Sequence, residues 1–158
     1  MPPSLPRFID LTLEHTNFVV SALTASAILY TRSAAIAYFS IGAVVCSRTV
    51  KLLKRCFRQP RPLHTTPGRQ KKSYGMPSTH SAVIAYYAAT LTRVIPPLII
   101  VPWSAVIAMS RIWLGHHTWP QVSVGCLYGI IFTPFWFMLW TSYGWNEYGQ
   151  ATEKYFVW

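Results

Sequence analysis

The sequence predicts an all-α, polytopic membrane helix bundle of about five transmembrane helices, formed as a single domain over residues 1–158. Of the 158 residues, 52% are hydrophobic and only 11% are charged, and the mean hydropathy is +0.28. A small soluble domain cannot bury that much apolar surface, so a lipid bilayer is the expected surrounding. The net charge of +10 does not indicate a nucleic-acid partner, because basic nucleic-acid binders carry more charge and fewer large apolar side chains.

Five apolar stretches are the expected spans, and they cover residues 11–30, 33–53, 78–92, 94–113 and 118–141. A span takes about 20 apolar residues, which the first and third stretches barely supply. The basic stretch 54–77, rich in Pro and Gly, is expected to be an ordered loop rather than a helix. Pro60 disfavours helical backbone at the residue before it, so the preceding helix should end near Arg58. With two spans before it, this loop shares a membrane face with the connection 114–118.

Acidic residues occur only near the two ends of the chain, as Asp10, Glu14, Glu147 and Glu153. Twelve of the fourteen Lys and Arg residues lie between these ends. The middle of the chain therefore holds no aspartyl-phosphate nucleophile, no glycosidase carboxylate pair and no carboxylate site for Mg²⁺ or Ca²⁺. The three cysteines have no CxxC spacing and provide no disulfide framework. We expect the ligand of the middle region to be an anion.

The segment 54–62, KRCFRQPRP, carries the first candidate residues. Lys54 should lie on the last turn of the second span, with Arg61 just beyond it. Both cations could face an anionic ligand. The alternative is that they extend to lipid headgroups, as Lys and Arg commonly do at the ends of spans.

The segment 77–80, PSTH, opens the third span. Ser78 or Thr79 can cap this helix, and a helix N-terminus with its N–H groups and positive dipole end favours an anion. His80 would then lie beside the anion and could donate a proton to it. The alternative is an ordinary Ser cap next to an interfacial histidine.

The segment 110–121, SRIWLGHHTWPQ, contains adjacent histidines. Arg111 ends the fourth span and Gly115 breaks it. Since adjacent residues do not share a helix face, at most one of His116 and His117 should enter a common site. A zinc site of both histidines is disfavoured because no carboxylate or cysteine pair lies nearby, so we expect no metal.

Taken together, these segments resemble the three-part signature of the type 2 phosphatidic acid phosphatase superfamily, whose site is shared with vanadium haloperoxidases. The matching residues are Lys54, Arg61 and Pro62; Pro77, Ser78, Thr79 and His80; and Ser110, Arg111 and His117. The resemblance implies that His117 attacks phosphorus and forms a phosphohistidine, and that His80 protonates the leaving oxygen and then activates water. It also implies a phosphate site of Lys54, Arg61, Ser78, Thr79, Arg111 and the nearby backbone N–H groups, without metal or other cofactor.

Three features depart from that family pattern. Thr79 stands where Gly is more common, Gln121 stands where an Asp usually orients the nucleophile, and two spans rather than three precede the first motif. The HTWPQV form at 117–122 and RQPRP at 58–62 resemble the dolichyl diphosphatase branch. That resemblance implies removal of the terminal phosphate of dolichyl diphosphate in the endoplasmic reticulum membrane, which recycles the lipid carrier of protein N-glycosylation. The alternatives are a phosphatidate or isoprenoid monophosphate phosphatase and a catalytically silent membrane scaffold.

Gln121 has two interpretations. It can complete a capping box with Thr118, or its oxygen can accept the ring N–H of His117 and orient that histidine. A neutral partner stabilises an imidazolium less than Asp does, and we expect this to suffice for a diphosphate, whose leaving group is good. We expect His116 to be an interfacial neighbour. The membrane face of the site is ambiguous, because the distribution of Lys and Arg indicates the cytosol whereas the resemblance implies the lumen.

Overall fold

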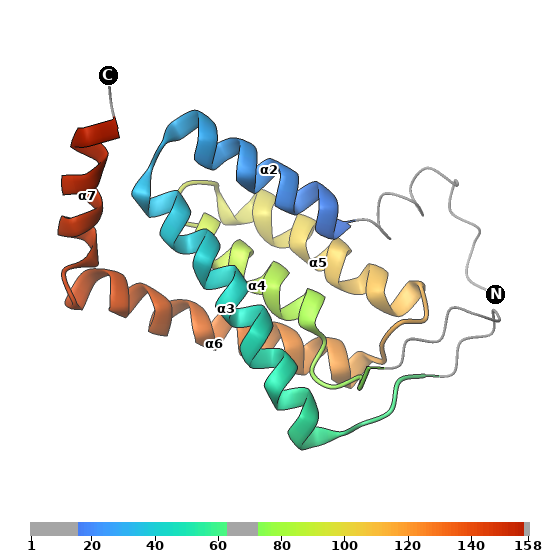
Figure 1. Cartoon of the computed structure of the whole chain (residues 1–158). Helices are drawn as coiled ribbons and strands as arrows, with labels where there is room; N and C mark the ends of the chain where they lie inside the picture. The colour runs from blue at the N-terminus through green and yellow to red at the C-terminus, as the bar shows by residue number, and fades with distance from the viewer. Residues whose placement is uncertain (1–15, 63–72, 157–158) are drawn as a thin grey trace. The chain divides into compact units, whose positions relative to one another are not determined.

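The computed structural model describes residues 16–62 and 73–156, and within these ranges the chain is helical and has no strand. The helices are α2 (Thr16–Thr31), α3 (Ala34–Phe57), α4 (Thr79–Leu91), α5 (Pro97–Trp113), α6 (Trp119–Ser142) and α7 (Trp145–Phe156) (Figure 1). The all-α prediction is confirmed, and α2 to α6 fall on the five apolar stretches. Helix α7 was not predicted from the sequence.

The predicted loop 54–77 differs from the structure at its start, because residues 54–57 belong to the last turn of α3. The helix ends one residue before Arg58, which has a φ of 48° and donates its backbone N–H to the Lys54 carbonyl at 3.0 Å. Helical backbone thus stops where Pro60 predicted it would. Residues 63–72 of the loop, like residues 11–15 of the first apolar stretch, lie outside the described residues.

Two helices, α3 and α6, are long and apolar enough to cross a membrane, with 24 residues each. Helix α5 and residues 18–31 are apolar but shorter. Helix α4 has only 13 residues, which corresponds to about 20 Å at the usual helical rise. A bilayer core is about 30 Å thick, so the count of five spans stays a prediction.

The chain divides into two compact units, one of residues 1–42 and 137–158 and the other of residues 43–136. In the first unit, aromatic rings pack against one another. Tyr38 and Trp140 have ring centroids 4.6 Å apart, and Phe39 stacks on Phe137 at 6.1 Å. None of the candidate site residues belongs to this unit.

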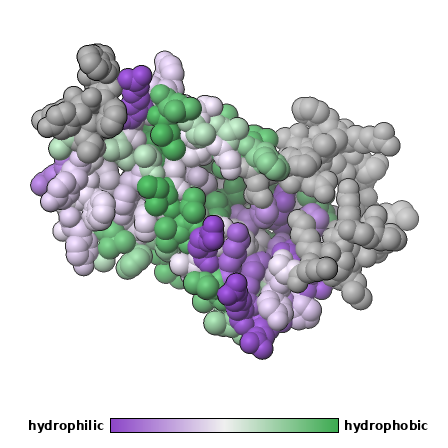
Figure 2. All heavy atoms as spheres, in the orientation of Figure 1, coloured by the Kyte–Doolittle hydropathy of each residue, from purple (hydrophilic) through white to green (hydrophobic). Residues whose placement is uncertain are grey.

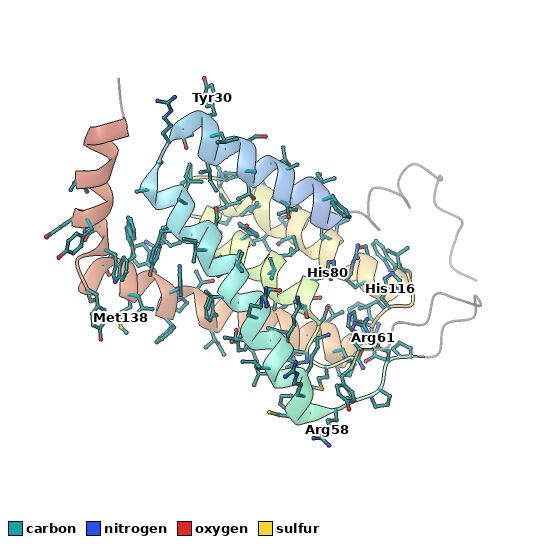
Figure 3. The ribbon with its side chains drawn as sticks, viewed as in Figure 1. Tyr30, Arg58, Arg61, His80, His116 and Met138 are labelled. Atoms are coloured by element: carbon teal, nitrogen blue, oxygen red, sulfur yellow. The ribbon has the colours of Figure 1, made fainter. Side chains whose placement is uncertain are left out.

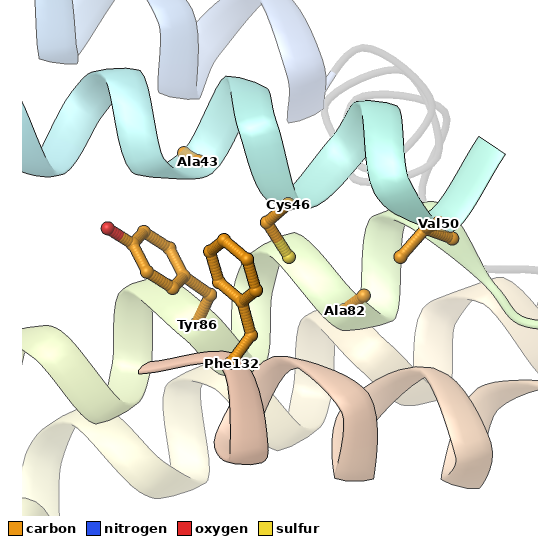
Figure 4. Close-up of a cluster of buried hydrophobic side chains, with 6 residues drawn as sticks. All are labelled: Ala43, Cys46, Val50, Ala82, Tyr86 and Phe132. Carbon is orange, nitrogen blue, oxygen red and sulfur yellow. The ribbon is translucent and has the colours of Figure 1, made fainter. Parts of the chain in front are cut away.

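The second unit, residues 43–136, is built around α4 (Figure 1). Its core joins three helices: Ala43, Cys46 and Val50 of α3, Ala82 and Tyr86 of α4, and Phe132 of α6 (Figure 4). Helix α5 also packs on α4. Every candidate site residue lies in this unit. Helix α4 packs against each of the other three helices, α3, α5 and α6.

Helix α6 approaches α4 closely through two glycines one turn apart. A Cβ atom on Gly125 would lie 2.6 Å from the Ser78 carbonyl oxygen, and one on Gly129 would lie 3.0 Å from the Tyr86 backbone nitrogen. Small residues at this spacing are typical of closely packed membrane helices. The close approach places the start of α6 against the start of α4.

Candidate active site

Lys54 and Arg61 turn inward and are bound by the loop segment that follows residue 72. Lys54 is only 6% exposed, and its Nζ donates to the Tyr74 carbonyl at 3.0 Å. The Nε of Arg61 donates to the Ser73 carbonyl and its Nη2 donates to the Ser73 hydroxyl, both at 2.9 Å. The lipid-headgroup alternative is therefore wrong for Lys54, whose ammonium group is held inside the protein.

Arg61 also joins the first motif to the third. Its Nη1 donates to the His116 carbonyl and to His117 Nε2, in each case at 3.1 Å. These bonds confirm that the two loops lie together, as the sequence predicted. Figure 3 shows Arg61, His80 and His116 at one end of the helices, whereas the Arg58 side chain extends away from them. Burial lowers the pKa of Arg61 from its ordinary value, although a guanidinium keeps its charge at any physiological pH.

The tautomer of His117 follows from its two neighbours. A guanidinium can only donate, so Nε2 of His117 must be the acceptor and carries a lone pair. The proton then lies on Nδ1, which donates to Gln121 Oε1 at 3.1 Å. His117 is 4% exposed. The ring thus presents Nε2, the nitrogen that could act as a nucleophile, towards a cation and away from bulk solvent.

The pKa of His117 is lowered from 6.5 to about 3. Burial is the largest cause, and the positive charge of Arg61 is the next. Lys54 and His80 lower it further by their charge, while the hydrogen bond to Gln121 opposes the change. The imidazole is consequently neutral at any pH at which the protein would work.

Ser78 caps α4, as one of the sequence predictions stated. Its hydroxyl oxygen accepts from the backbone N–H of Ser81 at 3.4 Å and from the Ser81 hydroxyl at 2.9 Å. Its own N–H donates to the Gln121 carbonyl at 2.9 Å. Thr79 and His80 form the first turn of α4 and are partly exposed. The Ser78 N–H is thus bonded to Gln121, and Thr79 and His80 are partly exposed residues of the first turn, so their predicted contact with an anion stays a prediction.

Arg111 is almost completely buried at the end of α5, with 2% of its surface exposed. Its Nε and Nη2 donate to the Ser110 hydroxyl at 3.2 Å, and its carbonyl accepts from the backbone N–H groups of His116 and His117. Gly115 permits this return of the chain because its φ is +68°, a conformation that residues with a Cβ rarely adopt. The His116 side chain is buried in the protein, with 7% of its surface exposed, and its expected position at the membrane interface stays a prediction.

Gln121 satisfies both interpretations at once. Its Oε1 accepts from the Thr118 backbone N–H at 3.3 Å, as in a capping box, and from His117 Nδ1 at 3.1 Å. Its Nε2 donates to the Pro60 carbonyl at 3.0 Å and to Gln59 Oε1 at 3.2 Å. The side chain is 1% exposed. The partners at residues 59 and 60 were not predicted, since no spacing in the sequence relates them to a residue about sixty positions away.

The site brings together several cations that donate to neutral groups. Figure 2 shows hydrophilic atoms gathered towards the end of α3, beside apolar surface along the helices. No Asp or Glu occurs between residues 15 and 146. Lys54, Arg61 and Arg111 each donate to a neutral carbonyl or hydroxyl oxygen. Across residues 16–62 and 73–156, no group of three or more His, Cys, Asp or Glu side chains is placed to hold a metal ion. Such a cluster is suited to a multiply charged anion.

An apolar groove lies farther along the same helices. It has a volume of about 260 Å³ and is lined by small and aliphatic side chains of α4, α5 and α6, among them Ile84, Ala88, Val101, Ala105, Ala108 and Ile130. Ala108 precedes Arg111 by one turn of α5, so the groove begins about one helical turn from the cation cluster. An amphipathic ligand could therefore place its charged end and its apolar chain in adjacent parts of this unit.

Comparison with known proteins agrees with this geometry. The profile of the PAP2 superfamily matches residues 33–145. Lipid phosphate phosphatase epsilon 1, chloroplastic, of Arabidopsis thaliana is 28% identical over 80% of this chain and 48% of its own length. Dolichyldiphosphatase 1 of Dictyostelium discoideum is 31% identical over 70% of this chain and 54% of its own length. The chain thus spans about half the length of the curated relatives that it matches.

The fold also matches a solved structure. The first transmembrane PAP2 type phosphatidylglycerolphosphate phosphatase from Bacillus subtilis superimposes with a TM-score of 0.65, over 92% of this chain and 79% of that one. At 19% identity, this likeness concerns the fold.

Proposed function

Because the chain belongs to the PAP2 superfamily, we propose that it is a lipid phosphatase that removes the terminal phosphate of a polyisoprenoid diphosphate of the dolichyl type. The observation that carries the proposal is His117, a buried neutral imidazole whose Nε2 lone pair points into a cluster of cations. A nucleophile of this kind needs a phosphorus atom made electrophilic by cations around its oxygens. Lys54, Arg61 and Arg111 supply that charge without a metal.

In the proposed first step, the Nε2 lone pair of His117 forms a bond to the terminal phosphorus. The bond between that phosphorus and the bridging oxygen breaks, and His80 donates a proton to the departing lipid phosphate. In the second step His80 takes a proton from water, the resulting hydroxide attacks the phosphohistidine, and inorganic phosphate leaves. His117 is returned as a neutral ring.

Arg61 gives the first step a precondition. Its guanidinium holds the Nε2 lone pair of His117 in the substrate-free state. A phosphate oxygen binds a guanidinium more strongly than a neutral imidazole does, because the bond is charge-assisted on both sides. The substrate itself therefore draws Arg61 off the nucleophile and leaves Nε2 uncovered in front of phosphorus.

The decisive experiment measures phosphate release from dolichyl diphosphate by the purified protein in detergent with EDTA present. We expect release by the wild type and none by His117→Ala, while Arg55→Gln, which removes an exposed charge of α3, retains activity. Activity that EDTA abolishes would contradict the proposal of metal independence. Absence of release from any lipid phosphate or diphosphate would leave a silent membrane scaffold as the function.

A lipid monophosphate phosphatase is the second candidate, and the similarity to a lipid phosphate phosphatase favours it. Gln121 separates the two candidates. With the neutral Gln121 as its partner, His117 is a weaker nucleophile than it would be beside Asp. Such a nucleophile suffices for a diphosphate, which loses a phosphate, but a monoester loses a poorer alkoxide leaving group and demands a stronger nucleophile. We therefore expect Gln121→Asp to gain activity on dolichyl phosphate relative to dolichyl diphosphate, and the absence of any relative gain would remove this argument for a diphosphate.

Placement in the endoplasmic reticulum membrane, and with it a role in N-glycosylation, rests on the similarity to dolichyldiphosphatases. Fractionation of cells that express the tagged protein tests the placement. Recovery of the protein with a different organelle would contradict the proposed role in N-glycosylation but not the proposed phosphatase reaction.

A further inference from the structure

The four hydrogen bonds of the Gln121 side chain determine which way its amide points. The Thr118 backbone N–H can only donate, so the atom that it reaches at 3.3 Å is the amide oxygen. The Pro60 carbonyl can only accept, so the atom that it reaches at 3.0 Å is the amide nitrogen. With the oxygen placed in this way, His117 Nδ1 must donate to it, and the proton of the imidazole is fixed on Nδ1.

Gln59 satisfies the second N–H of this amide. Its Oε1 accepts from Gln121 Nε2 at 3.2 Å. Because Gln121 is 1% exposed, an N–H without an acceptor there would be buried and unsatisfied. Gly75 packs against the same amide, since a Cβ atom there would lie 2.7 Å from the Gln121 Cδ.

The same contacts explain why residue 121 is an amide rather than an acid. A carboxylate at this position could accept from Thr118 and His117 but could not donate to Pro60 or Gln59. A carboxylate oxygen there would lie about 3 Å from the Pro60 carbonyl oxygen and from Gln59 Oε1, with no proton between them. Unpaired acceptors in contact at a buried site lower the stability of the folded protein. An amide therefore matches a loop that offers two acceptors at residues 59 and 60.

We propose that Gln59 is a positioning residue for the nucleophile: together with the Pro60 carbonyl it holds the Gln121 amide so that Oε1 faces His117, which keeps the catalytic Nε2 unprotonated. The catalytic consequence rests on the phosphatase function proposed above, whereas the placement of the proton does not. Gln59 acts on His117 through Gln121, to which both are hydrogen-bonded. In this arrangement one loop acts on both ring nitrogens of His117: Arg61 donates to Nε2, and Gln59 and Pro60 orient the amide that accepts from Nδ1.

Two substitutions in the full-length protein separate positioning from simple structural support. Gln59→Glu keeps an acceptor at the end of a side chain of equal length, whereas Gln59→Met keeps the length and removes the acceptor. Kinetics on dolichyl diphosphate at pH 7.5 would be combined with ¹⁵N NMR of the His117 ring nitrogens in detergent. The His117 signals are identified by their loss in His117→Asn.

For Gln59→Met we expect kcat to fall about three- to tenfold, as the loss of one buried hydrogen bond implies, with KM changed less than about twofold. Because one of the bonds that orient the Gln121 amide is lost, the Nδ1–H signal of His117 should weaken or broaden, while Arg61 still disfavours a proton on Nε2. Gln59→Glu should retain kcat within about twofold and keep the proton on Nδ1, since its carboxylate still accepts from Gln121.

A Met variant with the kcat and the Nδ1-protonated spectrum of the wild type would overturn the proposal. Equal damage in the Glu and Met variants would reduce Gln59 to a structural role and overturn it as well. If Gln59→Met does not fold, Gln59→Ala takes its place in both measurements, and a wild-type proton on Nε2 at neutral pH would by itself contradict the inferred orientation. A protein with the inferred tautomer and no phosphatase activity would instead refute the proposed function.

Discussion

At the scale of single residues, His117 is defined by opposed neighbours. A cation donates to one ring nitrogen and a neutral amide accepts from the other. Neither contact favours the protonated ring as strongly as a carboxylate would, and burial disfavours it further. In the proposed mechanism the nucleophile His117 is therefore neutral before the substrate binds, and the small contribution of Gln121 to imidazolium stability limits how strongly the ring can be activated.

Gln121→Glu should raise the pKa of His117, because a carboxylate beside Nδ1 stabilises the protonated ring. The lowered wild-type value of about 3 places protonation of His117 outside the working range. We expect the acid limb of kcat/KM for the variant to move upward by at least about one pH unit. The profile is measured between pH 4 and 8, and an unchanged acid limb would show that residue 121 does not control His117.

His117 should also make stability depend on pH. Its pKa is about 3 in the folded protein and near 6.5 when unfolded, so between these values the unfolded state binds more protons. Its contribution is complete above pH 6.5, decreases as the pH falls, and is lost near pH 3. We expect the thermal midpoint of the wild type in detergent to fall more between pH 7 and 4 than that of His117→Asn. Equal decreases would place the proton uptake elsewhere.

At the scale of helices, the site depends on how closely α6 approaches α4. Gly125 faces the Ser78 carbonyl, and the Gln121 carbonyl accepts from the Ser78 N–H at 2.9 Å. Gln121, whose side chain contacts His117, and Gly125 are thus one turn apart on α6, and both contact Ser78. Separation of these two helices would disturb the second and third motifs together.

Gly125→Val should separate them, since its Cβ would lie 2.6 Å from the Ser78 oxygen, which backbone cannot avoid by changing rotamer. We expect a destabilisation of about 2 kcal/mol, in the range of overpacked cores, and at least a tenfold loss of activity. Ser123→Val, an exposed site on the same helix, is the matched control. Thermal unfolding and phosphate release are measured for both, and a Gly125 variant that behaves like the control would contradict the close contact.

The elements and their caps were predictable because they depend on local chemistry. The end of α3 before Pro60 and the cap at Ser78 follow from backbone sterics and from orphan N–H groups. The partners of Lys54 and Arg61 were not predictable, because Ser73 and Tyr74 contribute backbone carbonyls that every residue type possesses. Helix α7 was missed because it carries no long apolar run. The bond from Arg61 to the His116 carbonyl was not predicted, because every residue type possesses a carbonyl.

At the scale of the whole molecule, the cation cluster and the apolar groove give residues 43–136 the amphipathic character of a lipid phosphate. A long isoprenoid chain needs the groove, whereas a short soluble diphosphate needs only the cations. The two parts of the ligand can be tested separately.

Ala105→Phe should narrow the groove, which Ala105 lines. We expect KM for dolichyl diphosphate to rise about tenfold, which corresponds to losing the burial free energy of one apolar group of modest size. KM for a short-chain isoprenyl diphosphate should change little. Val106→Phe is the control, since Val106 is 49% exposed and does not line the groove. Equal effects on the long and short substrates would remove the groove from the lipid path.

Cys56 reports the membrane face of the site. It is exposed in the last turns of α3, two residues after Lys54. If the active site faces the lumen, as dolichyl diphosphatase chemistry implies, a membrane-impermeant maleimide should label Cys56 in sealed microsomes only after permeabilisation. Cys56→Ser should abolish that labelling. Labelling of intact vesicles would place the site in the cytosol, where the distribution of Lys and Arg indicates.

The loop carbonyls that accept from Lys54 and Arg61 are neutral, and they stabilise a full positive charge less than an anion would. This difference has a kinetic consequence. In the proposed reaction inorganic phosphate is the second product, and its oxygens make charge-assisted bonds to these cations that a neutral carbonyl cannot make, so departure of the product competes with the next turnover. Turnover should therefore slow as phosphate accumulates, and tetrahedral anions such as sulfate in the buffer should act as competitive inhibitors. Such an enzyme would keep its full turnover rate only where phosphate is continuously removed from its surroundings.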